Sequence, residues 1–465
     1  METIHYPVKG RKLEQFVSQH TFDMLISGLL DWQQGPGVFG RLHLHPCWSV
    51  SSVLDKGYAG ETTYCFYEQM SIFRRLYEKT KDPKWLITEN ALAAHLLYLQ
   101  DPEGGFIHAT NEFEPTFDTR GCPIHFFSPV LCLTEFYLWP YGDKTIKEQI
   151  PGALDRQWEW SLKHSWGVGN GRFHPLTHPG WCGVTNQDLT AVAALALGGV
   201  AFGKWDRYEK FGKPTLDYLL SPAYYYPDMG LFERGDGVNY AERTVYNIHI
   251  LDKLRIIHDC TKDERIPGVI DNVTKHLFDA TFRSDDGLLY LARGAKTDPV
   301  DKTAVTGWEK GAIAFSGYPT LIGYMQDYVK RNPSPELETK LEALKETLAA
   351  YIFTDGTIPP GIFNPNPLFT LYSCPSIDGW ITMVMNLLGD KLKNPEIQKM
   401  PAIHRKLGNM TWKQKDRVWA IEKDGKLIYG GYTRFPGNIA HSDKDKPVWG
   451  SFENLEDCDY LEIID

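Results

Sequence analysis

The stretch Gly171-Arg172-Phe173-His174 contains a glycine that is followed, two positions later, by a bulky apolar residue. A glycine preceded by Asp or Asn is typical of a chain that leaves a helix, turns through a left-handed residue and runs on extended. Successive glycines of this kind are 57 to 69 residues apart, which is the length of one helical hairpin with its turns. The arrangement occurs six times, at Gly40, Gly105, Gly171, Gly230, Gly287 and Gly356.

Two kinds of apolar pattern alternate between these turns. Residues 335–353 carry leucines on one stripe and charges elsewhere, which predicts an outer helix with one solvated face. Residues 189–202 read LTAVAALALGGVAF and are apolar or small all round, as in a helix packed on several sides. Further inner helices are expected over 128–139, 244–258, 312–329 and 377–388, and further outer helices over 61–80, 83–99, 146–164 and 265–282.

Helical hairpins repeated six times predict a mainly α protein, an (α/α)6 toroid whose inner helices surround an axis and whose loops build one mouth. An open superhelix is the competing arrangement. We expect the toroid to span residues 1–400. Beyond that point the residues alternate between polar and apolar around Asp424-Gly425, which indicates a hairpin, and 448–452 and 460–464 resemble further strands. A small β-rich appendage is therefore expected at 401–465.

The composition limits the classes of partner. The chain has 465 residues, 42% of them hydrophobic, and a net charge of −10, which disfavours nucleic acid and anionic membranes as partners. Its eight cysteines stand singly, so neither a zinc site nor a disulfide scaffold is expected. The start resembles no signal peptide and no apolar run reaches 18 residues, which predicts a cytoplasmic protein. We expect no cofactor and a small-molecule or oligosaccharide substrate, and the pattern allows a homo-oligomer.

Polar side chains are concentrated in the loops that precede two neighbouring inner helices. The first loop carries Asp118, Arg120 and His125, and the second carries Gln187 and Asp188. A ring would bring Asp118 and Asp188, 70 residues apart, to adjacent positions at one mouth. Two carboxylates across a sugar cleave a glycosidic bond when one acts as acid and the other as base or nucleophile. The structural alternative is that Asp188 caps its helix and Asp118 pairs with Arg120.

Histidine, aromatic and basic side chains near these loops are candidates for substrate binding. Three histidines occupy equivalent points after their glycines and can act as bases or donors. Two tryptophans flanked by glycine suit stacking on sugar rings. No helix shows the carboxylate–histidine spacing of a metal site, so no metal is expected. The residues expected to bind substrate are His43, His108, Arg120, His125, His174, His178, Trp181, Gln187, Trp308 and Lys310.

These features resemble the six-hairpin toroid glycosidases, and most of all the unsaturated glucuronyl and rhamnogalacturonyl hydrolases and their β-glucuronidase-like relatives. The resemblance covers about 20–400 and rests on Phe117-Asp118-Thr119-Arg120 and Asn186-Gln187-Asp188-Leu189. Trp308-Glu309-Lys310-Gly311 is similar to the family's Trp-x-Arg-Gly, with Lys for Arg and later in the chain than in the family. The resemblance implies a glycoside hydrolase acting on uronic-acid-containing oligosaccharides. One Asp would protonate the sugar or its enol ether while activating water, and the other would hold the substrate.

Other chemistry on the same toroid stays open, because a fold alone does not decide function. A polysaccharide lyase would use tyrosine with histidine for β-elimination, for which Tyr64 is a candidate. A sugar epimerase would use His249 or His258 on an inner helix, and a terpenoid isomerase or dehydratase would use Cys122 or Cys182. A ring that binds a partner without catalysis is the remaining alternative.

Overall fold

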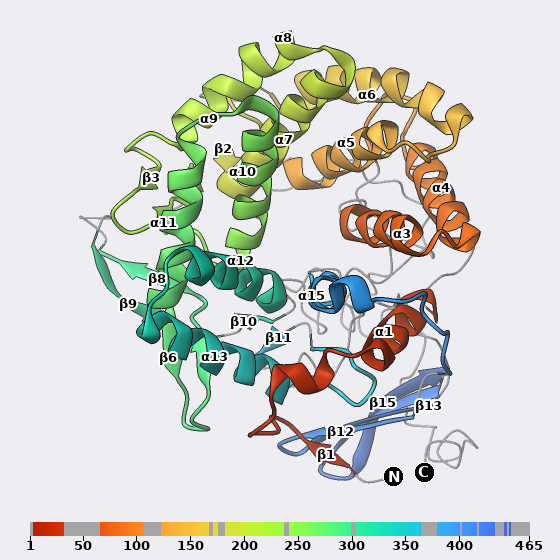
Figure 1. The fold of residues 1–465 in the computed structure, drawn as a ribbon, viewed down its shortest axis with the longest axis vertical. Coiled ribbons are helices and arrows are strands. Elements are labelled where there is room, and N and C mark those ends of the chain that lie inside the picture. The colour runs from red at the N-terminus through yellow and green to blue at the C-terminus, as the bar shows by residue number, and fades with distance from the viewer. Residues whose placement is uncertain are drawn as a thin grey trace.

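Helices alternate between an inner and an outer ring around one axis (Figure 1). The inner ring of the described chain consists of α3 (Phe66–Thr80), α5 (Pro123–Leu138), α7 (Thr185–Phe202), α10 (Asn247–Thr261), α12 (Tyr318–Arg331) and α15 (Trp380–Leu388). Its outer ring consists of α1 (Gln19–Asp31), α4 (Pro83–Tyr98), α6 (Lys144–His164), α9 (Lys213–Leu219), α11 (Ile266–Asp279) and α13 (Pro335–Ala350). The computed structural model describes residues 3–31, 66–106, 122–166, 171–174, 182–236, 241–298, 304–311, 313–315, 317–359, 361–363, 379–399, 402–415, 418–432, 441–443 and 446–447.

The ring closes through contacts between its first and last inner helices. Thr382 of α15 donates a hydrogen bond to Glu68 of α3 at 2.6 Å, and Arg75 of α3 binds Asn386 of α15 at 2.5 Å. An open superhelix would leave these two helices far apart. The predicted (α/α)6 toroid is therefore confirmed.

Helix α3 belongs to the inner ring, although the sequence pattern over 61–80 predicted an outer helix (Figure 1). Its charged residues suggested a solvated face. In the structure one of them, Arg74, is buried and forms an ion pair with Glu135 of the neighbouring inner helix α5. The helix is amphipathic because it has a charged side near the axis, which a sequence pattern does not distinguish from a side facing solvent.

The glycine turns mark the ends of the outer helices, as expected from the repeat. Gly171, Gly230, Gly287 and Gly356 have φ angles of 72°, 62°, 83° and 78°. In the second unit Gly104, with φ 109°, takes the left-handed conformation in place of Gly105, and Gly40 lies outside the described residues. After each of several turns the chain pairs back on itself, at Gln100↔Phe106, Trp166↔Phe173, Tyr225↔Phe232 and Phe282↔Tyr290.

Short strands and turns connect the two rings. The hairpins after α9 and α11 pair β3 (Tyr225–Tyr226) with β4 (Leu231–Phe232) and β6 (Thr281–Arg283) with β7 (Leu289–Leu291). Strand β2 (Cys182–Val184) pairs with β5 (Gly235–Asp236), and β10 (Ile313–Ala314) with β11 (Gly361–Ile362). A longer hairpin joins β8 (Gly294–Thr297) to β9 (Val305–Glu309). The remaining helical elements of the described chain are η1 (Leu13–Phe16), α8 (Trp205–Arg207), η3 (Tyr208–Gly212), η4 (Thr244–Tyr246) and η5 (Gly389–Lys391).

Replacing Gly230 by Ala is expected to lower the free energy of unfolding by more than about 2 kcal/mol. The φ of 62° at Gly230 disfavours a side chain, and a Cβ there would lie 2.1 Å from the backbone oxygen of Asn272. Urea unfolding measures the change. Gly323→Ala in α12 is the matched control, because its Cβ meets nothing within 4 Å and alanine favours a helix interior. Equal stabilities for the two variants would contradict the prediction.

Four strands of a five-stranded sheet follow the last inner helix in sequence, and the fifth comes from the start of the chain. Its order is β1 (Ile4–His5), β12 (Ile403–Leu407), β13 (Met410–Lys415), β14 (Val418–Lys423) and β15 (Lys426–Tyr432), with β1 parallel to β12 and the rest antiparallel. Asp424 and Gly425 have φ of 54° and 75°, which confirms the predicted hairpin. The start of the chain thus contributes a strand to the sheet. Strands β16 (His441–Asp443) and β17 (Lys446–Pro447) pair separately, and 448–452 and 460–464 lie outside the described residues.

Candidate functional site

Asp188 lies in the first turn of the inner helix α7, where it binds Arg172. The Arg172 Nε donates to Asp188 Oδ2 at 2.7 Å, and Nη2 donates to the same oxygen. Both side chains are buried, with 2% of Arg172 and 0% of Asp188 exposed. The other oxygen, Asp188 Oδ1, has no hydrogen-bond partner among the described residues. Within that part of the chain, Asp188 therefore does not cap its helix.

A second carboxylate, Asp236, binds the same guanidinium from the next repeat. Arg172 Nη1 donates to Asp236 Oδ1 at 3.1 Å, and the Asp236 side chain is 18% exposed. Strand β5 carries Asp236 and pairs with β2, so that Cys182 lies opposite Asp236 immediately before α7 begins. The Arg172 guanidinium also lies 4.6 Å from the centre of the Tyr224 ring. Two acidic groups from successive repeats thus share one arginine.

Asp236 was not among the site residues predicted from the sequence. A signal was present: Asp236 follows Gly230 by six residues, in the loop before the inner helix α10. Asp188 occupies a similar place in the preceding repeat, in the first turn of the inner helix α7. The acidic residues in the loops before all six inner helices, and not before two of them only, are therefore the set that contains Asp236.

The environment of Asp188 shifts its acidity. Burial raises the pKa of Asp188 to about 6, although the charge and hydrogen bonds of Arg172 lower it. Burial opposes the charged form of Arg172 too, but Asp188 raises the pKa of Arg172 above its ordinary value, so Arg172 remains protonated. A carboxyl group that titrates near 6 exchanges a proton easily close to neutral pH. The unpartnered Oδ1 can carry that proton while Oδ2 accepts from Arg172.

A second buried ion pair supports the same end of α7. Arg234 Nη1 donates to both Glu242 oxygens, at 2.9 and 3.0 Å, and to Asn186 Oδ1 at 3.1 Å. The Glu242 carboxylate also accepts from the backbone N–H of Arg243 at 2.9 Å. These bonds tie the loop of the fourth repeat to the residues beside Asp188. Because charged hydrogen bonds of this kind are directional, they fix where the helix begins relative to the loop.

Besides Asp188, the described residues include five sequence candidates: Gln187, His174, His125, Trp308 and Lys310. Gln187 is buried beside Asp188, and its Oε1 has no hydrogen-bond partner among the described residues. His174 is half-buried, and burial lowers its pKa. His125 has a structural contact, because its Nδ1 accepts from the Cys122 N–H at 2.9 Å at the start of α5. Trp308 lies on β9, in the hairpin at the outer edge of the toroid (Figure 1). The centre of its indole lies 5.3 Å from the centre of the His276 imidazole.

Lys310 follows β9 and is exposed, with its Nζ 5.5 Å from the centre of the Phe282 ring. Six further candidates lie outside the described residues and remain predictions: Asp118, His43, His108, Arg120, His178 and Trp181.

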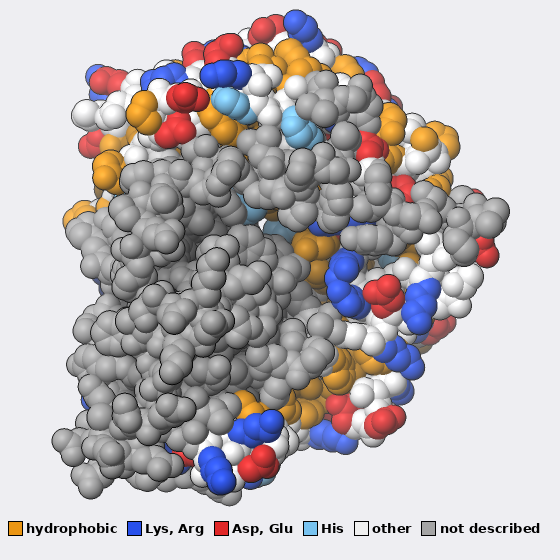
Figure 2. Space-filling model, turned by 180° about the vertical axis from the view of Figure 1, so that it is seen from behind, with side chains coloured by type: hydrophobic (Ala, Val, Ile, Leu, Met, Phe, Trp, Pro, Cys, Tyr) orange, Lys and Arg blue, Asp and Glu red, His pale blue; other side chains and the backbone are white. Residues whose placement is uncertain are grey.

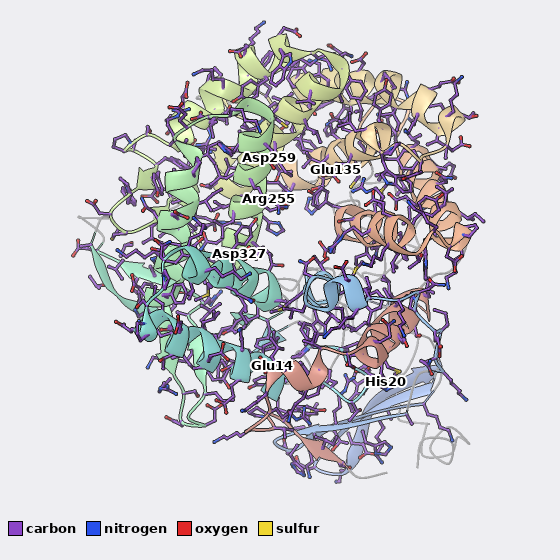
Figure 3. The ribbon with its side chains drawn as sticks, viewed as in Figure 1. Glu14, His20, Glu135, Arg255, Asp259 and Asp327 are labelled. Atoms are coloured by element: carbon purple, nitrogen blue, oxygen red, sulfur yellow. The ribbon has the colours of Figure 1, made fainter. Side chains whose placement is uncertain are left out.

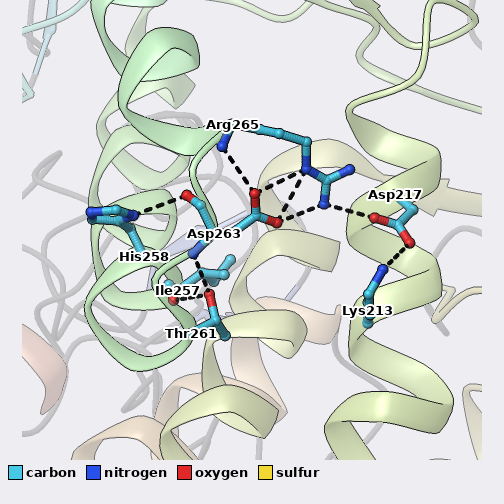
Figure 4. Close-up of polar contacts among 7 residues, drawn as sticks. All are labelled: Lys213, Asp217, Ile257, His258, Thr261, Asp263 and Arg265. Carbon is cyan, nitrogen blue, oxygen red and sulfur yellow. Dashed lines mark hydrogen bonds and ion pairs between the residues drawn. The ribbon is translucent and has the colours of Figure 1, made fainter.

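Of the two histidines named for an epimerase, one is held by a structural contact. The Nδ1 of His258 lies 3.0 Å from the backbone oxygen of Asp263, beside the ion pairs that Arg265 makes with Asp263 and Asp217 (Figure 4). His249 lies in the first turn of α10 and is half-buried. Burial opposes ionisation of Asp252, one helical turn further on, but Lys253, Arg255 and His249 lower its pKa.

Seen from the other side, several described histidine side chains reach the surface of the molecule (Figure 2). Among the described residues, no three His, Cys, Asp or Glu side chains are placed to hold a metal ion. None of the helices in the described ranges is long and apolar enough to cross a membrane.

Solved structures with a similar fold are carbohydrate enzymes of several kinds. A sugar epimerase from a ruminal bacterium has a TM-score of 0.56 and 14% identity, covering 81% of this chain and 98% of its own. Cellobiose 2-epimerase from Bacillus thermoamylovorans has a TM-score of 0.56 and 11% identity, covering 80% and 99%. An inactive variant of an α-1,6-mannanase from Salegentibacter, bound to α-1,6-mannotetrose, has a TM-score of 0.51 and 13% identity, covering 80% and 98%. No family model and no curated protein matches the chain. At these identities the likeness establishes the toroid fold.

Proposed function

We propose that this protein is a carbohydrate-active enzyme, and specifically a glycoside hydrolase acting on uronic-acid-containing oligosaccharides, with Asp188 as its proton donor. The observation that carries the proposal is the state of the Asp188 carboxyl group. Arg172 holds Oδ2, Oδ1 has no partner among the described residues, and burial raises the pKa to about 6. A general acid for glycosidic cleavage needs such a raised pKa and a fixed orientation.

The second carboxylate is proposed from two candidates. Asp118 is the partner that the sequence predicts, whereas Asp236 shares Arg172 with Asp188 and is partly exposed. An ionised group there would activate water or hold the substrate. The preference for a uronic acid comes from the family resemblance, with Arg120 as its predicted cation. Because Asp188 is fully buried, substrate binding must move the residues that cover it.

Product analysis tests the reaction class. We expect an unsaturated glucuronyl disaccharide or an aryl β-glucuronide to release reducing sugar or free aryl alcohol. A hydrolase creates no new carbon–carbon double bond, so no unsaturated product absorbing in the ultraviolet accumulates. A gain of that absorbance would identify a lyase, and a product of unchanged mass would identify an epimerase. Either result would contradict the hydrolase proposal.

The pH dependence tests the role of Asp188. With its pKa raised to about 6, the carboxyl group is protonated below that pH and ionised above it. We therefore expect kcat to fall as pH rises through about 6. Asp188 also binds its proton more tightly in the folded protein than in the unfolded chain, where its ordinary pKa is 3.8. Its contribution to the stability of the fold is therefore lost as the pH rises from 3.8 to about 6. A kcat that rises through the same range would assign Asp188 as a base.

A sugar epimerase is the second candidate function, favoured by one specific feature. His249 and Asp252 lie one turn apart on the inner helix α10, and a histidine beside a carboxylate can move a proton at a sugar carbon. Mannose and cellobiose are suitable substrates for the assay. A His249→Asn variant should lose an epimerase activity entirely while leaving glycoside hydrolysis measurable, which separates the two functions.

A further inference from the structure

A separate pocket of about 320 Å³ lies between the inner helices α3 and α5, towards their C-terminal ends. Each inner helix is followed by an outer helix that returns, so the inner helices run in the same direction. The last turns of α3 and α5 are therefore at the opposite end of the ring from Asp188, in the first turn of α7. The pocket is lined by Ser71, Arg74, Arg75, Glu78, Glu135, Leu138 and Trp139.

Buried ion pairs of Arg74 form one wall of the pocket. Arg74 is 7% exposed, its Nη2 binds Glu135, and its Nε lies 3.7 Å from Glu89 Oε1. Its Nη1 has no hydrogen-bond partner among the described residues. Glu135 also accepts from Tyr67 at 3.1 Å and lies beside the centre of the ring (Figure 3). The polar groups that a ligand in the pocket can reach are those of Arg75, Glu78 and Glu135, whose side chains are at least partly exposed.

The charges around the pocket indicate which ligand it fits. Arg74 and Arg75 supply two guanidinium groups, and Glu78 and Glu135 supply two carboxylates. The two carboxylates would repel an anion, and the two guanidinium groups would repel a cation. A neutral molecule that both donates and accepts hydrogen bonds suits all four. Leu138, 45% exposed, adds an apolar wall. Hydroxyl groups on a partly apolar ring have these properties.

We propose that the pocket between α3 and α5 binds a neutral sugar residue, as a second saccharide site on the face opposite Asp188. The site goes beyond the proposed function, since it requires neither Asp188 nor turnover. Its volume suits one sugar ring, with hydroxyl oxygens accepting from the Arg75 guanidinium and hydroxyl groups donating to Glu78 or Glu135.

Calorimetric titration of the full chain tests this site with glucose, mannose and cellobiose, and with galacturonate and glucosamine as charged counterparts. We expect the neutral sugars to bind both the unaltered chain and Asp188→Asn. Ser71→Trp fills the pocket and should weaken binding by at least about tenfold, and Arg75→Ala should weaken it by several fold. The matched control is Arg331→Ala, an exposed arginine at the end of α12, which should bind as the unaltered chain does.

Each outcome decides the proposal. A second site is supported if Ser71→Trp and Arg75→Ala lose sugar binding while their rate of hydrolysis equals that of the unaltered chain, including a rate of zero. Binding that survives in both variants and disappears in Asp188→Asn would place the sugar in the mouth and reject the second site. Tighter binding of galacturonate or glucosamine than of glucose, when sensitive to Ser71→Trp, would overturn the assignment to a neutral sugar. A chain that hydrolyses nothing but still shows the Ser71-dependent binding would refute the proposed function alone.

Discussion

Replacing Asp188 by Asn is expected to lower kcat by about a thousandfold, within the range that general acid catalysis supplies. Asparagine keeps the size of the side chain and one oxygen for Arg172, but it cannot deliver a proton. The raised pKa of Asp188 means that its ionised form is disfavoured in the fold, and Asp236 remains to compensate Arg172. We therefore expect only a small change of stability beside the large loss of rate. Steady-state kinetics on the folded fraction measures the first, and urea unfolding the second.

The matched control is Asp355→Asn. Asp355 is likewise buried and accepts from an arginine, Arg405, at 2.8 Å, but it lies after α13 in another repeat. This variant should lose stability to a similar or greater degree while keeping kcat per folded molecule. If Asp188→Asn keeps its rate and loses only stability, Asp188 is a structural partner of Arg172 and the hydrolytic proposal fails.

Replacing Arg405 by Ala is expected to lower the free energy of unfolding by about 3–5 kcal/mol, the usual effect of breaking a buried ion pair. Arg405 lies on β12 and is 1% exposed, and its guanidinium carbon lies 3.5 Å from the centre of the Phe353 ring. The Asp355 carboxylate, which also accepts from Thr357, would lose its cation inside the protein. Strand β12 of the sheet would thereby lose the buried ion pair that joins it to the residues after α13 of the toroid.

Urea unfolding checks this prediction, and amide hydrogen exchange in β12 and β13 reports on the sheet itself. Arg265→Ala is the control: Arg265 forms ion pairs with Asp217 and Asp263, but its side chain is 46% exposed (Figure 4). Solvent screens such pairs, so the change should stay within about 1 kcal/mol. Equal effects of the two variants would show that the Arg405 pair does not attach the sheet.

Much of the fold could be predicted because its signals are local. Gly230 and Gly356 turn the chain where the repeat places them, and Asp424-Gly425 forms the expected hairpin. The apolar composition of 189–202 identified α7 as an inner helix. The pattern over 61–80 was misleading, because Arg74 of α3 is buried against Glu135 and is not solvated. Charge content alone does not reveal which surface receives a charged residue.

The candidate site could be predicted only in part. Asp188 was identified from its position before an inner helix, but the sequence offered a helix cap or a catalytic group, and the structure shows a partner, Arg172, sixteen residues earlier. Asp236 was missed, since its relation to Arg172 spans 64 residues. The structure thus adds Asp236 to the acidic residues that the sequence identified.

The sequence by itself determined much of the repeated unit: the glycine turns that end the outer helices α6, α9, α11 and α13, the all-round apolar character of α7, and the change to strands after the last inner helix. These features depend on backbone preferences and on burial over a few residues, which neighbouring side chains already specify. Only the tertiary structure decided which charges meet. The packing of successive repeats places Arg172 between Asp188 and Asp236, and Arg74 beside Glu135, because contacts between repeats depend on the position of whole helices.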